Sequence, residues 1–542
     1  MSAPHVEGAL FQQLRAALPA QLLGMLSTRR WFGGKGRAIQ STQVVDCIPV
    51  RLKRTVAYIL FLRVTYAEGP DETYVLPTVP LEEDPDASMV AGAPVLRIPG
   101  QEGTTHLLLG DALANQEFLS FLFEAVAGRM HFPGMAGEMR ADHTSVFHSL
   151  RDSSGAMPRG KLMKAEQSNT SIAYGQSLIL KFFRRLEEGI NPDLELGLYL
   201  TEKAHFPQIP PVAGWLEYES EDGRKMALGM LQGFVSNQGD AWQYTLTALS
   251  KFCAIVSADP EGVQGVRSPG QFHGLSDPDL PDELRAAVQE YGAAAALLGK
   301  RTAELHLALA SATSDPAFTP EPFTPSFCKS LEDSLRELTR RTFRLLHGRL
   351  NSLPEHLRGQ AEKVAALEGN VLKKFHLALQ GRISAMRTRI HGDYHLGQVL
   401  VTGSDMVIID FEGEPARPLS ERRAKRSPLQ DVAGMLQSFR YASQAPLHVP
   451  AAGGMAARGD FHHLEQWLER WHSFVSSRFL ESYFERSGSA CYLPSKQEEC
   501  VSLLNLHLLE KAVYELGYEL NNRPEWLGIP LGSIPKLLEQ RE

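Results

Sequence analysis

The chain has 542 residues, of which 43% are hydrophobic and 22% charged, so it can build a large core divided over several domains of roughly 100–200 residues each. Its net charge is -8, and no basic footprint marks it as a nucleic-acid-binding protein. No apolar run approaches the roughly 18 residues of a membrane span, and the N-terminus lacks the order of a signal peptide. Five scattered cysteines without a CxxC pair predict free thiols in a reducing cytoplasm.

The first 130 residues mix helical and strand patterns. Leu10 to Leu26 is amphipathic, and Val56 to Tyr66 is rich in β-branched and aromatic residues, as strands are. Gly33 to Gly36 (GGKG) lacks the spacing of a phosphate-binding P-loop and is interpreted as a turn. Turn-forming residues cluster between Gly128 and His143, which predicts a domain boundary there.

The middle of the chain predicts a β-hairpin, a helix and a second hairpin. SIAYG and Ser177 to Phe183 are expected to pair around a turn at Gly175 and Gln176. Asn191 to Lys203 is expected to be a helix capped by Asn191, with leucines at helical spacing. PPVAGWLEY and KMALGMLQGFV are expected to be strands.

After about residue 236 the pattern is mainly helical, with one short buried strand predicted in the VIID run that ends at Asp410. The basic run Glu421 to Arg426 is interpreted as a solvated segment leading into a helix. In that helix apolar residues keep a spacing of three and four, and Asp431 near its start suits the helix dipole.

Four polar residues around this strand predict phosphoryl-transfer chemistry. The kinase pattern places an amide residue five positions after the catalytic Asp of H-R-D and then a metal-binding Asp in D-F-G. Here Gln398 follows Asp393 by five positions, and Asp410 and Glu412 follow the strand. A lone HGD is usually an ordinary capped turn, but the joint spacing favours Asp393 as catalytic base, with Gln398, Asp410 and Glu412 holding Mg²⁺.

The nucleotide-binding half of such a site is expected upstream. Lys181 lies on an apolar strand and needs a partner; Glu195, in the following helix, can form an ion pair with it, and Asp193 is the alternative. Two further segments are expected to bind ATP. The first is a turn rich in hydroxyl and amide groups, with Ser168, Asn169 and Thr170. The second is the end of the last strand before the helices, with Met230, Leu231 and Gln232, whose backbone would bond an adenine.

At these residues the chain resembles the maltokinases of the aminoglycoside-phosphotransferase-like branch of the protein-kinase-like fold. QSNTSIAYG, HGDYHLGQVL, IIDFEGEPARPLSERRAKRSPLQDVAGML and KAVYELGYELNNRPEWLGIPL are similar to blocks of that family, and RRWFGGKGR is similar to the start of its cap domain. The matches span about residues 29 to 530. The last two of the four blocks are more specific than HGD…D, which marks only the superfamily.

The resemblance implies an α+β, bilobal protein-kinase-like fold. It places an N-terminal cap subdomain in residues 1–135, a β-rich nucleotide-binding lobe in 136–235 and a helical lobe in 236–542. It implies ATP- and Mg²⁺-dependent phosphorylation of maltose to maltose 1-phosphate, which feeds glycogen or α-glucan synthesis. A trehalose synthase is the candidate protein partner.

Residues that suit a disaccharide are expected after the metal-binding Asp and near the C-terminus. The alternative for Arg417 is an arginine in a surface loop, and the alternative for Trp526 is a buried core residue. Taken together, however, a block that contains aromatic residues, glutamates and an arginine favours a sugar pocket. The expected substrate residues are His391, Arg417, Tyr514, Glu515, Tyr518, Arg523 and Trp526.

Three alternatives stay open at the level of sequence. A glucosamine kinase would share the same cap and motifs, and the fold cannot choose the sugar. An antibiotic phosphotransferase would need a strongly acidic cleft. A catalytically silent kinase fold that binds a trehalose- or glucan-converting enzyme would need a hidden defect, because Lys181, Asp393, Gln398 and Asp410 are all present.

Overall fold

The computed structural model describes residues 11–81, 96–99, 106–151, 158–163, 169–258, 282–311, 314–448 and 461–539. The chain divides into two compact units, Met1–Ser236 and Asn237–Glu542, and each is described by itself. None of the described helices combines the length and the apolar composition that a membrane crossing requires.

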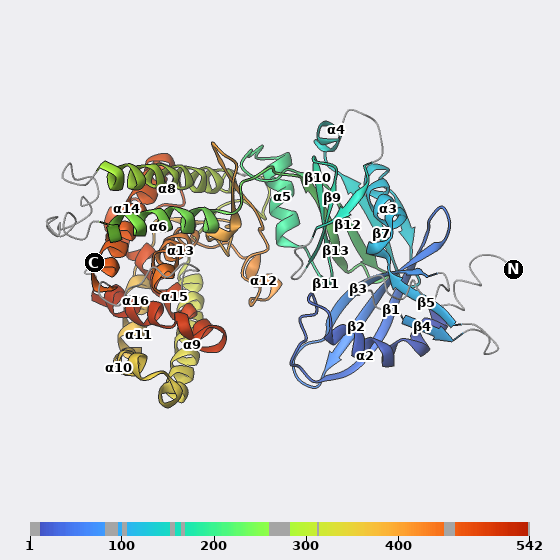
Figure 1. Ribbon diagram of the computed structural model, residues 1–542, viewed down its shortest axis with the longest axis horizontal. Helices are drawn as coiled ribbons and strands as arrows, with labels where there is room; N and C mark the ends of the chain where they lie inside the picture. Colours follow the sequence, from blue (N-terminus) through green and yellow to red (C-terminus); the bar gives the residue numbers. More distant parts are fainter. Residues whose placement is uncertain are drawn as a thin grey trace. The chain divides into compact units, whose positions relative to one another are not determined.

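The first unit contains two antiparallel sheets (Figure 1). Helix α2 (Pro19–Ser27) packs on the first sheet, whose strand order is β1-β2-β3-β5-β4. The predicted strand Val56 to Tyr66 is confirmed as β2, and residues 33–36 lie in a turn, as predicted. The strands of this sheet are β1 (Ile39–Arg51), β2 (Val56–Tyr66), β3 (Glu72–Pro80), β4 (Leu96–Pro99) and β5 (His106–Asp111), with β11 (Arg185–Leu186) paired to β3.

The second sheet of this unit has the order β6-β7-β12-β13-β10-β9-β8. The passage from Gly128 to His143, predicted as a boundary, forms two of its strands. Helices α3 (Gln116–Ala127), α4 (Phe147–Leu150) and α5 (Pro192–Glu202) contact this sheet, whereas η3 (Ala112–Ala114) contacts β3 of the first sheet. Its strands are β6 (His131–Pro133), β7 (Gly137–His143), β8 (Gly160–Leu162), β9 (Asn169–Tyr174), β10 (Leu178–Phe183), β12 (Val212–Ser220) and β13 (Lys225–Gly233).

Both hairpins and the helix predicted in this region are confirmed. β9 and β10 pair around Gly175, whose φ of +65° is the left-handed conformation that glycine adopts without strain. β12 and β13 form the second hairpin. The Asn191 side chain accepts a hydrogen bond from Leu194 N at 3.0 Å and so caps α5.

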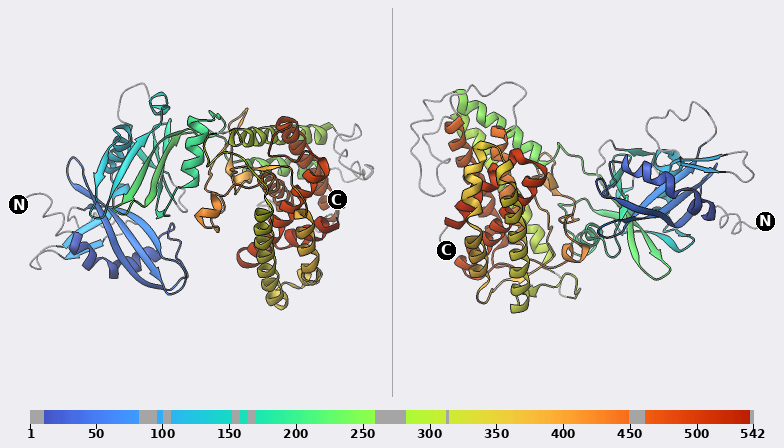
Figure 2. Two further views of the ribbon diagram at one scale, coloured as in Figure 1. Left: turned by 180° about the vertical axis from the view of Figure 1, so that it is seen from behind. Right: turned by 90° about the horizontal axis from the view of Figure 1, so that it is seen from below.

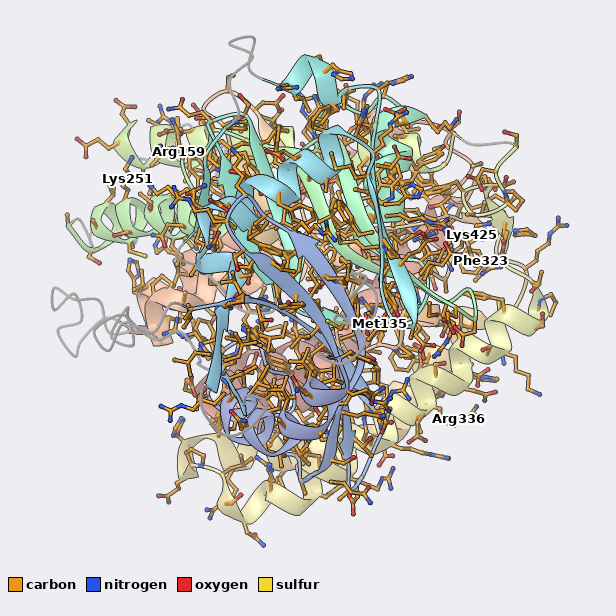
Figure 3. All side chains as sticks on the ribbon, turned by 90° about the vertical axis from the view of Figure 1, so that its right-hand side faces the viewer. Met135, Arg159, Lys251, Phe323, Arg336 and Lys425 are labelled. Carbon is orange, nitrogen blue, oxygen red and sulfur yellow. The ribbon has the colours of Figure 1, made fainter. Side chains whose placement is uncertain are left out.

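A buried carboxylate ties the two sheets together. Asp46, on β1, is 1% exposed and accepts hydrogen bonds from the backbone N–H groups of Met135 and Ala136 at 2.7 and 2.9 Å and from the Tyr218 hydroxyl at 2.7 Å (Met135 is labelled in Figure 3). Buried charges persist in proteins when they are hydrogen-bonded in this way. The two sheets also share a continuous apolar core, which includes Phe61 from β2 and Leu216 from β12.

The second unit is mainly helical, as predicted (Figure 2). α8 and α14 lie side by side, and α15 packs among α13, α9 and α16. Its long helices are α6 (Ala241–Ala258), α8 (Asp282–Leu309), α9 (Pro325–Arg349), α10 (Glu355–Ala365), α11 (Glu368–Leu379), α13 (Leu429–His448), α14 (Phe461–Ser487), α15 (Gln497–Asn522) and α16 (Gly528–Glu539). The strands gather in the first unit and the long helices in the second, so the predicted α+β class is confirmed.

Short elements of the second unit carry the motif residues. The strand predicted in the VIID run is confirmed as β17 (Met406–Ile408), which pairs with β16 (Val399–Val401). A second two-stranded sheet pairs β14 (Glu321–Pro322) with β15 (Met386–Arg387). The unit also contains short helical turns, which are η4 (Leu350–Ser352), η5 (Leu396–Gln398), α12 (Leu419–Arg422) and η6 (Pro524–Trp526).

The basic run before α13 is not the solvated segment that the sequence predicted. The Lys425 side chain is only 7% exposed, and its Nζ donates to Glu321 Oε1 and to Pro316 O, both at 2.6 Å (Lys425 is labelled in Figure 3). The Arg426 side chain is 17% exposed. The segment is therefore anchored, because a buried lysine must be paired.

Candidate active site

In the first unit, Lys181 is held by a buried carboxylate. Lys181 Nζ donates to Asp193 Oδ2 at 2.9 Å, where the lysine side chain is 21% exposed and the aspartate 1%. The sequence preferred Glu195 and kept Asp193 as the alternative partner, and this ion pair is the one with Asp193. Glu195 lies half-buried on the same helix, and its role stays a prediction.

The sheet register decides which predicted residues share a face with Lys181. Lys181 is directly opposite Ser171 on β9 and Met230 on β13, so these three side chains lie on one face. Thr170 is opposite Phe182 and therefore lies on the other face, where its hydroxyl is buried and accepts a hydrogen bond from Arg184 Nε at 2.9 Å. The prediction that Thr170 binds phosphate is corrected: Ser171 occupies that face instead.

The backbone at Met230 to Gln232 is also engaged. β13 lies between β12 and β10, and both neighbours pair with it over residues 230–232. These backbone groups are therefore already bonded within the sheet, so the predicted backbone contact of Met230, Leu231 and Gln232 with an adenine base is corrected. Asn169 lies half-buried at the start of β9, whereas Ser168 lies outside the described residues.

In the second unit, a buried aspartate of α13 holds the loop that carries Asp393. Asp431 Oδ2 and Oδ1 accept the backbone N–H groups of His391 and Gly392 at 2.8 and 2.9 Å, and Oδ2 lies 3.2 Å from His306 Nε2. Asp431 lies in the first turn of α13, as predicted, and the structure adds this anchoring contact. A Cβ at Gly434, one turn on, would meet Tyr394 O at 2.6 Å, so only glycine lets the loop approach α13 this closely.

His391 supports the loop from inside. It is 1% exposed, its Nε2 lies 2.9 Å from Ile409 O, and its Nδ1 accepts Asp393 N at 3.4 Å. Its ring also packs against Phe411 with centroids 4.9 Å apart. The predicted contact between His391 and substrate is therefore corrected: Nε2 joins the Asp393 loop to Ile409, just before Asp410, and Nδ1 is bonded within the loop.

The residues expected to hold a metal lie beside one another in this unit. Gln398 Nε2 donates to Asp410 Oδ2 at 3.1 Å, which leaves the Gln398 amide oxygen for another partner. Asp410 has a φ of +69°, a conformation that costs energy for a non-glycine residue and concentrates at functional sites. Carboxylate and amide oxygens are the ligands that Mg²⁺ prefers, so Gln398, Asp410 and the half-buried Glu412 fit the expected ion.

A pocket in the second unit brings Asp393 together with two of the predicted substrate residues, Arg417 and Tyr514. Asp393 lies at its wall with a side chain that is 20% exposed, 3.9 Å from His395 Nε2. Burial, with Lys511 and His391 nearby, lowers the pKa of His395 below its usual 6.5. The other lining residues are Gly392, Tyr394, Glu414, Gln430, Asp431, Gly434, His507, Glu510 and Lys511.

Most charges of this pocket are already matched. Burial acts to raise the pKa of Glu510, but the hydrogen bond and charge of His507, with Arg417 and Arg426, hold it at about 2. Glu510 Oε2 lies 2.9 Å from His507 Nδ1, and its Oε1 lies 3.3 Å from Arg417 Nη2. The buried Nε2 of His507 lacks a hydrogen-bond partner among the described residues, so it can bind a group on a ligand.

The remaining predicted substrate residues do not line this pocket. Glu515 is buried and accepts a hydrogen bond from Gln437 Nε2 at 2.7 Å, on the side of α15 that faces α13. Tyr518 lines the neighbouring pocket. Trp526 stacks on Tyr441 with centroids 5.8 Å apart, and Arg523 pairs with Glu519 at 2.8 Å.

Sequence reasoning missed three pocket residues that a known pattern could have found. His507, Glu510 and Lys511 precede Tyr514 on α15 by seven, four and three positions, which is the spacing of one helix face. Glu414 and Gln430 gave no such signal, because only the tertiary fold brings them to Asp393.

The buried Glu515 gives a pH-dependent prediction. Burial raises the pKa of Glu515 from its usual value of 4.5 to about 7, so this carboxyl stays protonated to a higher pH in the folded protein than in the unfolded chain. The stability of the native protein therefore falls as pH rises from about 4.5 to 7, and stays reduced above it. Glu515→Gln should stabilise the protein by roughly 2–3 kcal/mol at pH 8 and by little at pH 5.

The check is the melting temperature of both proteins between pH 5 and pH 8. The matched control is Glu525→Gln, at an exposed position in the turn that follows α15. It should change the melting temperature little at any pH. A gain for Glu515→Gln that is equal at pH 5 and pH 8 would contradict the prediction.

Comparison with known families agrees with this geometry. Residues 25–113 match the family described as "Maltokinase N-terminal cap domain", and residues 275–449 match APH, the "Phosphotransferase enzyme family". The chain is 24% identical over 385 residues to a glucosamine kinase of Mycolicibacterium smegmatis, covering 69% of this chain and 78% of the relative. It is 23% identical over 383 residues to a glucosamine kinase of Streptacidiphilus jiangxiensis, covering 69% and 73%.

Solved structures show the same fold. A glucosamine kinase in complex with glucosamine, ADP and inorganic phosphate aligns with a TM-score of 0.60 at 16% identity, over 95% of this chain and 98% of its own. A second glucosamine kinase structure, crystal form A, aligns with a TM-score of 0.61 at 16% identity, over 98% and 99%. Residues 25–113 therefore match a maltokinase N-terminal cap domain, residues 275–449 match an APH phosphotransferase domain, and the chain has a kinase-like fold.

Proposed function

We propose that the protein is an ATP-dependent maltokinase, which phosphorylates the anomeric hydroxyl of maltose to give maltose 1-phosphate and ADP. The observation that carries the proposal is the pocket in which Asp393 meets Arg417, Tyr514 and other polar side chains on one wall of the helical unit. A carboxylate in such a pocket can accept the proton of a sugar hydroxyl. The cap domain supports a sugar as the acceptor.

The other site residues have defined roles in this proposal. Lys181, paired with Asp193, would neutralise nucleotide phosphates, and Glu195, Asn169 and Ser171 belong to the same region. Gln398, Asp410 and Glu412 would hold Mg²⁺, which supplies charge neutralisation at the transferred phosphate. The chain after Gly233 would contact the adenine. Residues 1–135, 136–235 and 236–542 are proposed as cap, nucleotide lobe and catalytic lobe.

The charge of the pocket favours a neutral sugar. Of the four carboxylates that line it, Glu510 is paired with Arg417 and His507, and Asp431 with the loop N–H groups and His306. Glu414 shares a hydrogen bond with Tyr514, and the cation of Lys511 lines the same pocket. An amino sugar would bring an ammonium group that needs a free carboxylate.

A glucosamine kinase is the second candidate, because the two curated relatives described above carry that name. If maltose is the substrate, the product feeds glycogen or α-glucan synthesis, with a trehalose synthase as the candidate partner. A catalytically silent role as the partner of such an enzyme is the third candidate, and it predicts no turnover at all.

The test is ADP release with Mg²⁺-ATP against maltose, glucosamine, glucose, trehalose and an aminoglycoside. We expect turnover with maltose at a kcat/KM at least tenfold above that of the other four, because the paired charges of the pocket disfavour cations. Turnover with glucosamine instead would keep the assigned catalytic groups and replace the sugar. Sugar binding without turnover, in a protein that binds ATP, would favour the silent partner.

A further inference from the structure

The strand that carries Lys181 continues from the second sheet of the first unit into the first sheet. β10 belongs to the second sheet, and β11, which follows it almost directly, pairs with β3 of the first sheet (Figure 1). At the crossing point, Val75 N of β3 donates to Arg184 O at 2.9 Å. Because the crossing lies a few residues after Lys181, both sheets fix the position of that strand.

The side chain of Arg184 joins the two sheets at this crossing. The residue is 2% exposed, and its Nε donates to the Thr170 hydroxyl on β9 at 2.9 Å. Its Nη2 donates to Asp111 Oδ2, at the end of β5, at 2.8 Å. Asp111 is itself held in place, because its Oδ1 accepts Leu113 N at 3.0 Å and so caps η3. A buried guanidinium needs such partners, and here they tie β9 and β10 to the cap.

The RRWFGGKGR motif packs on the same arginine. The Arg184 Cζ lies 5.3 Å from the centroid of the Trp31 ring, within the range of a cation–π interaction. Trp31 in turn packs against Tyr74, with centroids 5.9 Å apart, and the Tyr74 hydroxyl accepts Gly33 N at 3.2 Å. The turn at residues 33–36 therefore helps to hold the Trp31 ring over Arg184.

The two faces of the β9–β10 hairpin have different surroundings. Lys181 and Ser171 lie opposite one another on one face. Thr170 and Phe182 lie opposite one another on the other face, where Phe182 is buried in the core that the two sheets share. Arg184 follows Phe182 by two positions and therefore shares its face. The cap thus supports from behind the hairpin whose other face carries Lys181.

We propose that Arg184 is a positioning residue for the nucleotide, and that the cap, through Asp111 and Trp31, is a fixed wall of the nucleotide site. Arg184 ties β9, which follows the predicted phosphate-binding turn, to the strand of Lys181. A displaced hairpin would move the Lys181 ammonium away from the phosphates that it neutralises. The inference rests on the proposed nucleotide site at Lys181 and not on the identity of the sugar. It gives the cap a role in ATP affinity instead of the choice of sugar.

The experiment measures the Kd of a fluorescent ATP analogue, with Mg²⁺, for the wild type, Thr170→Val, Arg184→Lys and the double variant. Thr170→Val removes the hydroxyl that Arg184 bonds, and Arg184→Lys keeps the charge beside Asp111 but loses the fork that reaches both partners. We expect each single change to raise the Kd about fivefold, as for residues that act through others. The double variant should lose less than the product of the two, because both changes break one link. The KM for maltose should stay at the wild-type value.

Two further variants are the controls. Lys181→Met should weaken ATP binding directly, whereas Arg224→Met, which breaks an exposed ion pair with Asp222 in the same unit, should bind ATP as the wild type does. A lower melting temperature of Thr170→Val and Arg184→Lys with an unchanged Kd for ATP would overturn the inference, because the link would then be purely structural. An equal rise in the Kd for ATP and the KM for maltose would overturn it as well. Weaker ATP binding in both variants, in a protein that phosphorylates none of the sugars, would support it, and only the proposed function would fail.

Discussion

Replacing Asp393 by Asn should lower kcat by about 10²- to 10⁴-fold, because the amide cannot accept the proton of the sugar hydroxyl. The substitution keeps the size of the side chain. The loop is held through the backbone contacts of its neighbours His391 and Gly392 with Asp431, which do not involve the Asp393 carboxylate. The fold and nucleotide binding should therefore be unaffected.

Three measurements check this expectation together: ADP release at saturating sugar, the Kd of a fluorescent ATP analogue, and the melting temperature. Asp333→Asn makes the same chemical change on the exposed surface of α9, where the side chain is 55% exposed, and should leave all three at wild-type values. Unchanged turnover in Asp393→Asn would remove Asp393 from its assigned role. Lost ATP binding would show a defect in the fold instead of a defect in proton transfer.

The sequence predicted the elements whose signals are local. The cap at Asn191 and the β9–β10 hairpin depend on a few neighbouring residues, and both are confirmed. The spacing of Asp393, Gln398 and Asp410 is local as well, and the structure joins Gln398 to Asp410 through a hydrogen bond at 3.1 Å.

The errors arise where a long-range contact decides the outcome. Strand periodicity gave no register, so Thr170 was expected to bind ATP together with its neighbours, although one position in a strand moves a side chain to the other face. Trp526 was expected to bind a sugar because it lies in a block of aromatic, acidic and arginine residues. In the structure its ring stacks on Tyr441, a residue distant in the sequence. A spacing of four places Tyr514 and Tyr518 on one face of a helix, and their rings do lie together, yet this spacing could not say which face of α15 meets Asp393.

The anchor of the Asp393 loop should be the most sensitive position for stability. Asp431→Ala leaves two buried backbone N–H groups and His306 without their acceptor, at a cost of about 3–5 kcal/mol. Activity should fall as well, because the loop loses the contacts that place Asp393. The melting temperature and kcat of Asp431→Ala at pH 7 give both values, with Asp333→Asn again as the neutral comparison.

The pH dependence of this loss separates a charged anchor from mere packing. Burial would raise the pKa of Asp431, but His306, His391 and the Gly392 N–H outweigh it, and the net pKa is below the usual 3.8. A depressed pKa contributes stability above the unfolded value, which is lost as pH falls through the folded one. The stability difference between wild type and Asp431→Ala should therefore be constant from pH 8 to about 5 and shrink below about 4. If the stability difference instead persists unchanged at the lowest pH at which both proteins still fold, the loss of stability comes from the cavity that Asp431→Ala leaves behind. The carboxylate charge would then contribute nothing to holding the loop.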